Sequence, residues 1–172
     1  MVDPPRTPED GRANSSGNLL KYADFRIGQL FVAGPHRVEE SEILDFARQW
    51  DAQPFHIDPE AAKSTQWQGI IASGWHTCAI AMRLAVEAVL RDSNSSGSPG
   101  LEYLRWPHPV RPGDELRLSI EVLELRQSRS KEHGVVRWRW QLRTQRGDTV
   151  LDTIATSLFS IPSQAQSAVH PT

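Results

Sequence analysis

The sequence contains one cysteine, Cys78, among its 172 residues, so no disulfide can form within the chain. It also lacks an excess of either charge, because the formal net charge is -2 at pH 7. Proteins that bind nucleic acid or anionic membranes usually carry a strong basic excess or a basic cluster. We therefore expect a small molecule or another protein as the partner, and neither nucleic acid nor a membrane.

Long apolar runs are missing as well. The longest nearly uncharged stretch, residues 69–82, is shorter than the ~20 apolar residues that span a bilayer. The first residues lack the basic and then apolar layout of a signal peptide. Together with the single cysteine, these absences predict a cytoplasmic protein without a transmembrane segment.

Two segments have a composition that does not favour folding. Residues 1–18 are rich in Pro, Asp, Glu, Ser and Gly with almost nothing apolar, and residues 163–172 look similar. Such segments bury too little apolar surface to offset the entropy cost of ordering the chain. We expect a disordered N-terminal tail at 1–18, one domain at 19–162 and a flexible C-terminal tail at 163–172.

Helical periodicity dominates the first half of this domain. Within residues 40–50, the apolar residues Ile43, Leu44, Phe46, Ala47 and Trp50 recur at helical spacing. The segment from about 74 to 91 is apolar nearly all round, except for a stripe of Arg83, Glu87 and Arg91. A helix of this kind is buried on most sides.

The period changes to two in the second half. After a Ser- and Gly-rich loop expected at 93–100, strand-like runs cover residues 101–106, 115–125, 136–143 and 150–160. Turn residues separate the runs, which predicts an antiparallel meander. We expect an α+β fold in which an antiparallel sheet wraps around one long helix.

An acid and an imidazole lie close together between the two helices. Pro54 disfavours helix at Gln53, so Asp51 and His56 should lie on an irregular turn leaving a helix rather than on one helical face. A turn can direct both side chains at one point.

Several separated motifs occur in the order typical of one family. They are Phe46-Ala47, Asp51-x-x-Pro54-x-His56-x-Asp58-Pro59, Ala61-Ala62, Ile71-Ala72-Ser73-Gly74 and Val110-Arg-Pro-Gly-Asp114. Over most of its length between the tails, the chain resembles the MaoC-like (R)-specific enoyl-CoA hydratases and 3-hydroxyacyl thioester dehydratases, which have the hot-dog fold. Gln53 and Ser73 stand where the family usually has Asn and often has His.

The resemblance implies a site and an activity. It makes Asp51 and His56 the catalytic dyad, and it makes the Gly74 amide, with Ser73 beside it, the group that binds the thioester carbonyl. The implied substrate is an acyl-CoA or acyl-carrier thioester, with coenzyme A as part of the substrate and no other cofactor or metal. The resemblance also implies a homodimer or a dimer of dimers whose active sites lie at a shared interface.

The proposed residues fit the chemistry. Hydration of a trans-2-enoyl thioester to the (R)-3-hydroxyacyl form needs a base for the water, an acid for C2 and a donor for the oxyanion. An imidazole and a carboxylate can supply the first two, and the N-terminus of a helix can supply the third.

Structural roles are open for the same residues. Asp51 can cap a turn, His56 can be a structural histidine, and Ser73 can cap the long helix. We expect Asp58 to be an N-cap, His76 to lie at the surface or an interface, and Cys78 to be core packing. His36, His108 and His133 lack ligand spacing, so a zinc site is not expected.

Residues 136–143 also allow two interpretations. Trp138, Trp140 and Leu142 alternate with Arg137, Arg139 and Arg143, which predicts one buried and one solvated face. The arginines could instead bind the phosphates of coenzyme A.

Two rival functions remain. The hot-dog fold also hosts thioesterases, and fold alone does not determine function. Gln53, and the bulky Trp67 and Trp75 beside the presumed pocket, leave open a non-catalytic acyl-thioester binding protein.

Overall fold

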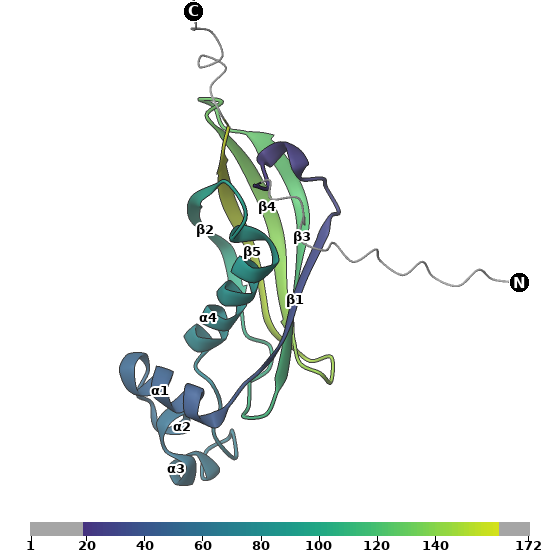
Figure 1. Ribbon diagram of the computed structural model, residues 1–172. Coiled ribbons are helices and arrows are strands. Elements are labelled where there is room, and N and C mark those ends of the chain that lie inside the picture. Colours follow the sequence, from purple (N-terminus) through teal and green to yellow (C-terminus); the bar gives the residue numbers. More distant parts are fainter. Residues whose placement is uncertain (1–18, 162–172) are drawn as a thin grey trace, which may run out of the picture.

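The structure is a computed structural model that describes residues 19–161 (Figure 1). The predicted tails at 1–18 and 163–172 lie outside this range. The elements follow the order η1 (Tyr22–Asp24), β1 (Leu30–Arg37), α1 (Glu40–Trp50), α2 (Pro54–Ile57), α3 (Pro59–Lys63), α4 (Gly74–Ala85), η2 (Val86–Leu90), β2 (Ser95–Arg105), β3 (Glu115–Gln127), β4 (His133–Arg143) and β5 (Thr149–Ser160). Within this range no helix is long and apolar enough to cross a membrane.

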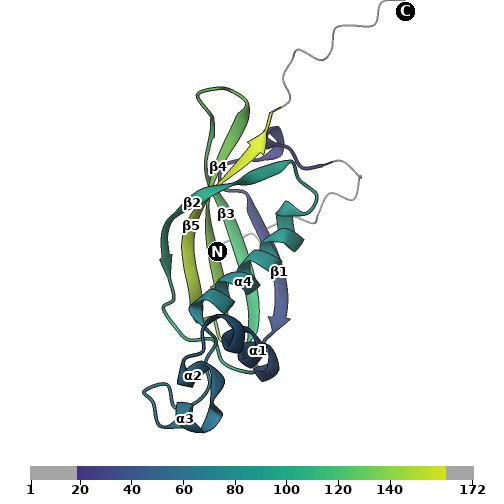
Figure 2. The same cartoon turned by 90° about the vertical axis from the view of Figure 1, so that its left-hand side faces the viewer.

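The strands form one sheet in the order β1-β3-β4-β5-β2, with every neighbouring pair antiparallel. Strands β3, β4 and β5 make the predicted meander. The meander prediction was wrong for β2, which pairs with β5 at the far edge of the sheet rather than with β3. Helix α4 lies along one face of the curved sheet, as the two views in Figures 1 and 2 show.

The loop predicted at 93–100 is largely strand, because β2 begins at Ser95. Its first residues are small and exposed, and they pair with β5 through the backbone with several register shifts. An edge strand that buries few side chains carries no period-two signal, so the sequence pattern could not reveal it.

The core lies between α4 and the sheet. Ile80, Leu84 and Ala85 of α4 are buried in one apolar cluster with Leu118 and Ile120 of β3. Burying an Ile or Leu side chain contributes about 1.5–3 kcal/mol. On β4, the tryptophan and leucine face is buried as predicted, with Trp138, Trp140 and Leu142 all at most 5% exposed.

The long helix is shorter than predicted. Its α-helical part ends at Ala85, and a wider π-type turn, η2, continues to Leu90. The exposed Arg83 and Glu87 form an i, i+4 ion pair at 3.4 Å between Arg83 Nε and Glu87 Oε1.

Helices α1, α2 and α3 gather near the N-terminal end of α4, beyond the end of the sheet (Figures 1 and 2). The predicted site residues therefore meet at this end of the molecule.

Candidate active site

Asp51 lies at the end of α1, where its backbone N–H donates to Ala47 O over 2.8 Å. Gln53 is extended because Pro54 follows it, and Pro54 then begins the one-turn helix α2 that carries His56. The two side chains therefore lie on different elements, as predicted. The expectation of an irregular turn was wrong for His56, which is helical, because a proline fits the first position of a helix.

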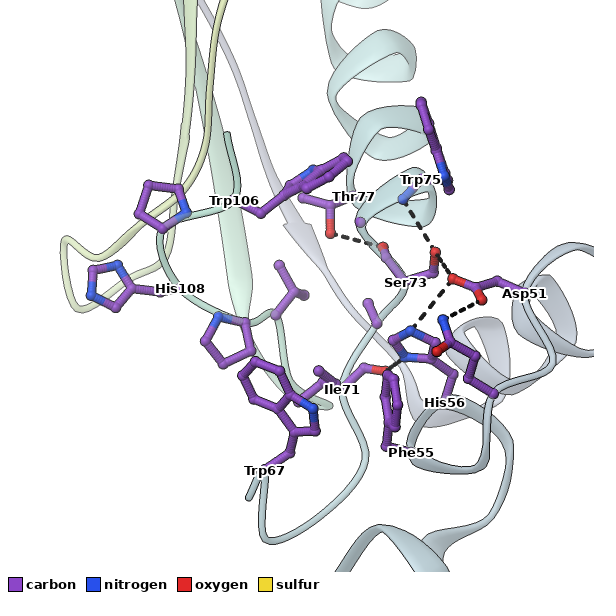
Figure 3. Close-up of a pocket in the computed structure, with 16 residues that line it drawn as sticks. Asp51, Phe55, His56, Trp67, Ile71, Ser73, Trp75, Thr77, Trp106 and His108 are labelled. Carbon is purple, nitrogen blue, oxygen red and sulfur yellow. Dashed lines mark hydrogen bonds and ion pairs between the residues drawn. The ribbon is translucent and has the colours of Figure 1, made fainter. Parts of the chain in front are cut away.

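The ring of His56 is buried and fixed by a backbone carbonyl. Its Nδ1 lies 2.7 Å from Ile71 O, and since a carbonyl oxygen only accepts, Nδ1 holds a hydrogen. In the neutral ring, the lone pair is then on Nε2. This Nε2 lies 3.4 Å from Asp51 Oδ2 (Figure 3). The geometry leaves Nε2 available as a base on the side of Asp51.

Two side chains hold the carboxylate of Asp51. Ser73 Oγ donates to Oδ2 over 2.6 Å, and Gln53 Nε2 donates to Oδ1 over 2.8 Å. Burial opposes ionisation, but the bonds from Ser73 and Gln53 and the nearby His56 outweigh it and hold the pKa of Asp51 below its ordinary value. Asp51 is therefore an anion at neutral pH and accepts hydrogen bonds only.

Ser73 has two roles at the start of α4. It is the N-cap, as predicted, because its Oγ accepts from Trp75 N over 3.2 Å while donating to Asp51. Gly74 is the first residue of the helix, so its N–H has no partner within the helix and lies at the positive end of the helix dipole. An N-terminal amide of this kind can stabilise an oxyanion.

Glycine is the only residue type that fits at position 74 without a shift of Trp106. A Cβ built on Gly74 would lie 2.7 Å from Cε2 of the Trp106 indole. Trp106 follows β2 and forms a T-shaped pair with the exposed Trp75, with 5.7 Å between ring centroids. The close packing of the indole on the Gly74 backbone makes Trp106 one wall of the site (Figure 3).

A cavity of about 290 Å³ joins these groups. Its lining combines the polar side chains already described with aromatic rings and prolines. The lining residues are Asp51, Gln53, Phe55, His56, Trp67, Ile71, Ala72, Ser73, Gly74, Trp75, Thr77, Trp106, Pro107, His108, Pro109 and Val110. All four site residues predicted from the sequence therefore line one cavity, which is mostly apolar with a polar cluster at one side.

The motif at 110–114 supports the cavity wall. Arg111 Nη2 donates to Trp67 O over 2.7 Å, and Val110 O accepts from Ala72 N over 2.9 Å. The buried Asp114 accepts from the backbone N–H of Arg111 over 2.8 Å. These bonds tie the segment before β3 to the segment that leads into α4.

Sequence reasoning missed two parts of the site. The carbonyl of Ile71 sets the tautomer of His56, but a backbone acceptor leaves no mark in the sequence. Trp106 was not singled out, although a tryptophan directly before Pro107 at a strand end was a usable signal. Trp67 and Trp75, by contrast, line the cavity as expected.

Other candidate residues have structural roles. Asp58 is the N-cap of α3, as predicted, with Oδ1 accepting from Glu60 N and Ala61 N. Burial raises the pKa of the Cys78 thiol more than a hydrogen bond with Trp106 lowers it, so the thiol stays protonated. The prediction for His76 was wrong, because this residue is only 6% exposed. It packs against α1 instead of facing solvent.

The arginines of β4 have partners on the sheet. Arg137 forms a bidentate pair with Glu102, and Arg139 forms one with Asp152 at 2.8 and 3.0 Å. These carboxylates compete with any phosphate for the same guanidinium groups. Among residues 19–161, no group of three or more His, Cys, Asp or Glu side chains is arranged to hold a metal ion.

A long helix against a five-stranded antiparallel sheet, with a polar cluster at the start of that helix, defines a hot-dog protein. Residues 24–140 match the sequence model of the MaoC like domain. The chain therefore belongs to the MaoC-like domain family.

Individual relatives agree with this placement. The uncharacterized protein YdeM of Bacillus subtilis (strain 168) is 33% identical over 117 residues, covering 68% of this chain and 82% of that protein. The solved MaoC-like dehydratase from Rhodospirillum rubrum is 40% identical, with a TM-score of 0.77 over 84% of this chain and 99% of that one. The R-hydratase PhaJ1 from Pseudomonas aeruginosa, 24% identical with a TM-score of 0.68 over 90% and 97%, shares the fold.

Proposed function

We propose that this protein is a hydro-lyase that reversibly hydrates a trans-2-enoyl thioester, an enoyl-CoA in the first instance, to the (R)-3-hydroxyacyl thioester. The observation that carries the proposal is the placement of His56 Nε2 and Asp51 Oδ2, 3.4 Å apart, beside the first amide of α4. This separation is longer than a good hydrogen bond and too short for a water between the two atoms, but a water on the cavity side of the pair can contact both.

In this mechanism the water lies on the cavity side of the dyad and contacts both residues. Asp51 accepts one of its hydrogen bonds, and His56 Nε2 takes its other proton as the oxygen bonds to C3. The electron pair of the C2–C3 double bond moves toward the thioester oxygen. The imidazolium, stabilised by the anionic Asp51, then returns the proton to C2. One water is added, and both residues regain their starting states.

The start of α4 stabilises the charge that develops on the thioester oxygen. The Gly74 N–H and the positive end of the helix dipole are fixed before the reaction, and the absence of a side chain on Gly74 lets the substrate approach. Losing a single donor of this kind costs about 10²–10³-fold in rate in other enzymes. This contribution is comparable to that of the acid-base pair, which is about 10²–10⁴-fold.

We also propose that the protein acts as a homodimer or a dimer of dimers. The proposal comes mainly from the family, and large exposed apolar side chains support it. Trp75 and Met82 of α4 and Leu101 of the edge strand β2 are each about half exposed or more. Large exposed apolar side chains are expected at an interface, where a partner would cover them. Light scattering at micromolar concentration that gives the monomer mass would contradict this proposal.

Absorbance of the conjugated enoyl thioester tests the activity. We expect absorbance to fall with wild-type protein and crotonyl-CoA or longer trans-2-enoyl-CoAs, and chiral analysis to give the (R)-alcohol. Asp51→Asn is the comparison, because the amide keeps the size of the side chain and removes its charge. A thiol reagent is added in parallel: release of free thiol would support a thioesterase, and saturable binding without turnover would support a binding protein.

A further inference from the structure

A second polar cluster lies beside the proposed site, in the first turn of α4. His76 of α4 is buried, and its Nε2 lies 3.4 Å from Oε1 of Glu42 on α1. Its ring also stacks on Phe46, with centroids 4.8 Å apart and 12° between the planes. Glu42 and Phe46 are four residues apart and so lie on the same face of α1. One side chain of α4 thus contacts two successive turns of α1.

Glu42 also contacts a residue of the sheet. His36, which lies in β1, places its Nε2 3.0 Å from the same Oε1 of Glu42. The carboxylate therefore lies within 3.4 Å of two imidazole nitrogens and joins β1, α1 and α4. The side chain of Glu42 is about one third exposed, whereas that of His76 is 8% exposed. The buried partner is the one on the helix that carries Gly74.

The protonation state of His76 follows from its surroundings. Its Nε2 faces the carboxylate, which favours the tautomer with the hydrogen on Nε2 and leaves Nδ1 as the unprotonated nitrogen. Within residues 19–161, Nδ1 is buried and has no hydrogen-bond partner. Burial lowers the pKa of His76, and the nearby His36 lowers it further. Glu42 raises this pKa, but the net shift is downward. The ring is therefore neutral at neutral pH.

The position of this contact connects it to the reaction. Asp51 leaves the last turn of α1, and Ser73 and Gly74 begin α4, so the two elements carry the two halves of the proposed site. Among the described residues, the polar side-chain links between these halves are the bond from Ser73 to Asp51 and the pair of His76 with Glu42. Two separated links fix both the distance and the relative angle of two helices.

We propose that His76, through Glu42 and Phe46, is a positioning residue that holds the start of α4 against α1 and so keeps the Gly74 amide in register with Asp51 and His56. The inference rests on the proposed hydratase function for its kinetic consequence. His76 does not line the cavity and does not act on the substrate.

Matched variants test this proposal. His76→Ala removes both contacts, whereas His76→Gln keeps an N–H donor at a similar reach. We expect His76→Ala to lower kcat for enoyl-CoA hydration about 10–100-fold with little change in KM, because misplacement by about 1 Å can cost 10²-fold. His76→Gln should recover most of the rate. Equal losses in both variants would mean that the ring only packs, and equal activity to wild type would mean that it positions nothing; either result overturns the proposal.

A second pair controls for folding. Glu42→Ala removes the acceptor, while Glu40→Ala makes the same change at an exposed residue in the same turn of α1. We expect kcat to fall about tenfold for Glu42→Ala and to stay within about twofold for Glu40→Ala. If His76→Ala fails to fold, the comparison of Glu42→Ala with Glu40→Ala is the test. Equal kcat values for these two variants would overturn the proposal.

A readout without substrate separates this inference from the proposed function. The amide resonance of Gly74 and the ring resonances of His56 should shift in Glu42→Ala and in His76→Ala, and should stay near wild type in His76→Gln and Glu40→Ala. Unchanged Gly74 and His56 resonances in Glu42→Ala would contradict the positioning role. Absence of hydratase turnover in wild type would instead contradict the proposed function and leave this comparison intact.

Discussion

Ser73 donates a hydrogen bond to Asp51 over 2.6 Å between Ser73 Oγ and Asp51 Oδ2, and it does so while capping α4 through Trp75 N. One hydroxyl thus orients the carboxylate and orders the helix whose first amide faces the cavity. A single small residue couples the two halves of the proposed site.

Removing this hydroxyl should affect stability and chemistry separately. Ser73→Ala is expected to cost about 1 kcal/mol of unfolding free energy, as for other N-caps. It should also raise the pKa of Asp51, because a bond to the charged form is lost. The acidic limb of kcat/KM against pH should then move to higher pH. Asp58→Ala removes the N-cap of α3 and is the control: a similar shift of the acidic limb in both variants would contradict the role of Ser73.

The charge of Asp51 should matter more than its shape. Asp51→Asn should lower kcat about 10²–10⁴-fold, because Asp51 orients the water and stabilises the imidazolium of an acid-base step that typically contributes this much. The unfolding free energy should fall modestly, because the amide still accepts from Ser73 but lacks the charge that the fold stabilises. Steady-state kinetics with crotonyl-CoA and urea denaturation of the same samples check both parts. Retention of more than about half the wild-type kcat would remove Asp51 from the mechanism.

Stability should fall as pH decreases below about 6.5 because of His76. Its pKa in the folded state is lower than its ordinary value of 6.5, so the unfolded state binds more protons between the folded-state pKa and 6.5. The contribution is fully present above 6.5 and is lost as pH falls through this window. The pKa of Asp51 is also lowered, but from 3.8, so its loss occurs at more acidic pH.

Urea denaturation at pH 7.5 and 5.5 measures this effect. The decrease in unfolding free energy between the two values should be larger for wild type than for His76→Gln, which has no group that titrates in this range. His36 faces the same carboxylate and is present in both proteins, so it does not account for a difference. An identical decrease in both proteins would show that His76 is protonated equally well in the folded and unfolded states.

The contact of Trp106 with Gly74 predicts a coupled pair of mutations. Gly74→Ala places a Cβ 2.7 Å from the indole, and such overpacking typically costs about 1–3 kcal/mol. Trp106→Ala makes space, so the double variant should be more stable than the sum of the single changes, with a coupling of about 0.5–3 kcal/mol. Additive effects in a double-mutant cycle would show that the contact does not limit residue 74.

Much of the fold could be predicted from the sequence, for identifiable reasons. Residues on β3 and β4 alternate because one face covers α4, and a buried face produces a period-two pattern. Strand β2 could not be recognised over Ser95–Gly100, because its small, exposed residues bury no apolar face against the core. Strand β2 lies beside β5 because the chain crosses to the far edge of the sheet, and no local sequence pattern predicts this connection.

The environment of α4 was harder to predict. Trp75 is 63% exposed and the adjacent His76 is 6% exposed, the reverse of what hydropathy suggests. The reason is tertiary, since Phe46 and Glu42 on α1 provide a stacking surface and an acceptor for the imidazole. The motif predicted which residues form the proposed site. It could not predict the tautomer of His56, because that depends on the carbonyl of Ile71, 15 residues away.

The most direct test of the central claim is the product formed from crotonyl-CoA in deuterium oxide, followed by NMR with wild type and with His56→Ala. We expect wild type to give (R)-3-hydroxybutyryl-CoA with one deuterium at C2 and the thioester intact, and the variant to be slower by about 10²-fold or more. Unreacted crotonyl-CoA with wild type, or crotonate with free coenzyme A, would contradict the claim that Asp51, His56 and Gly74 form a hydratase site.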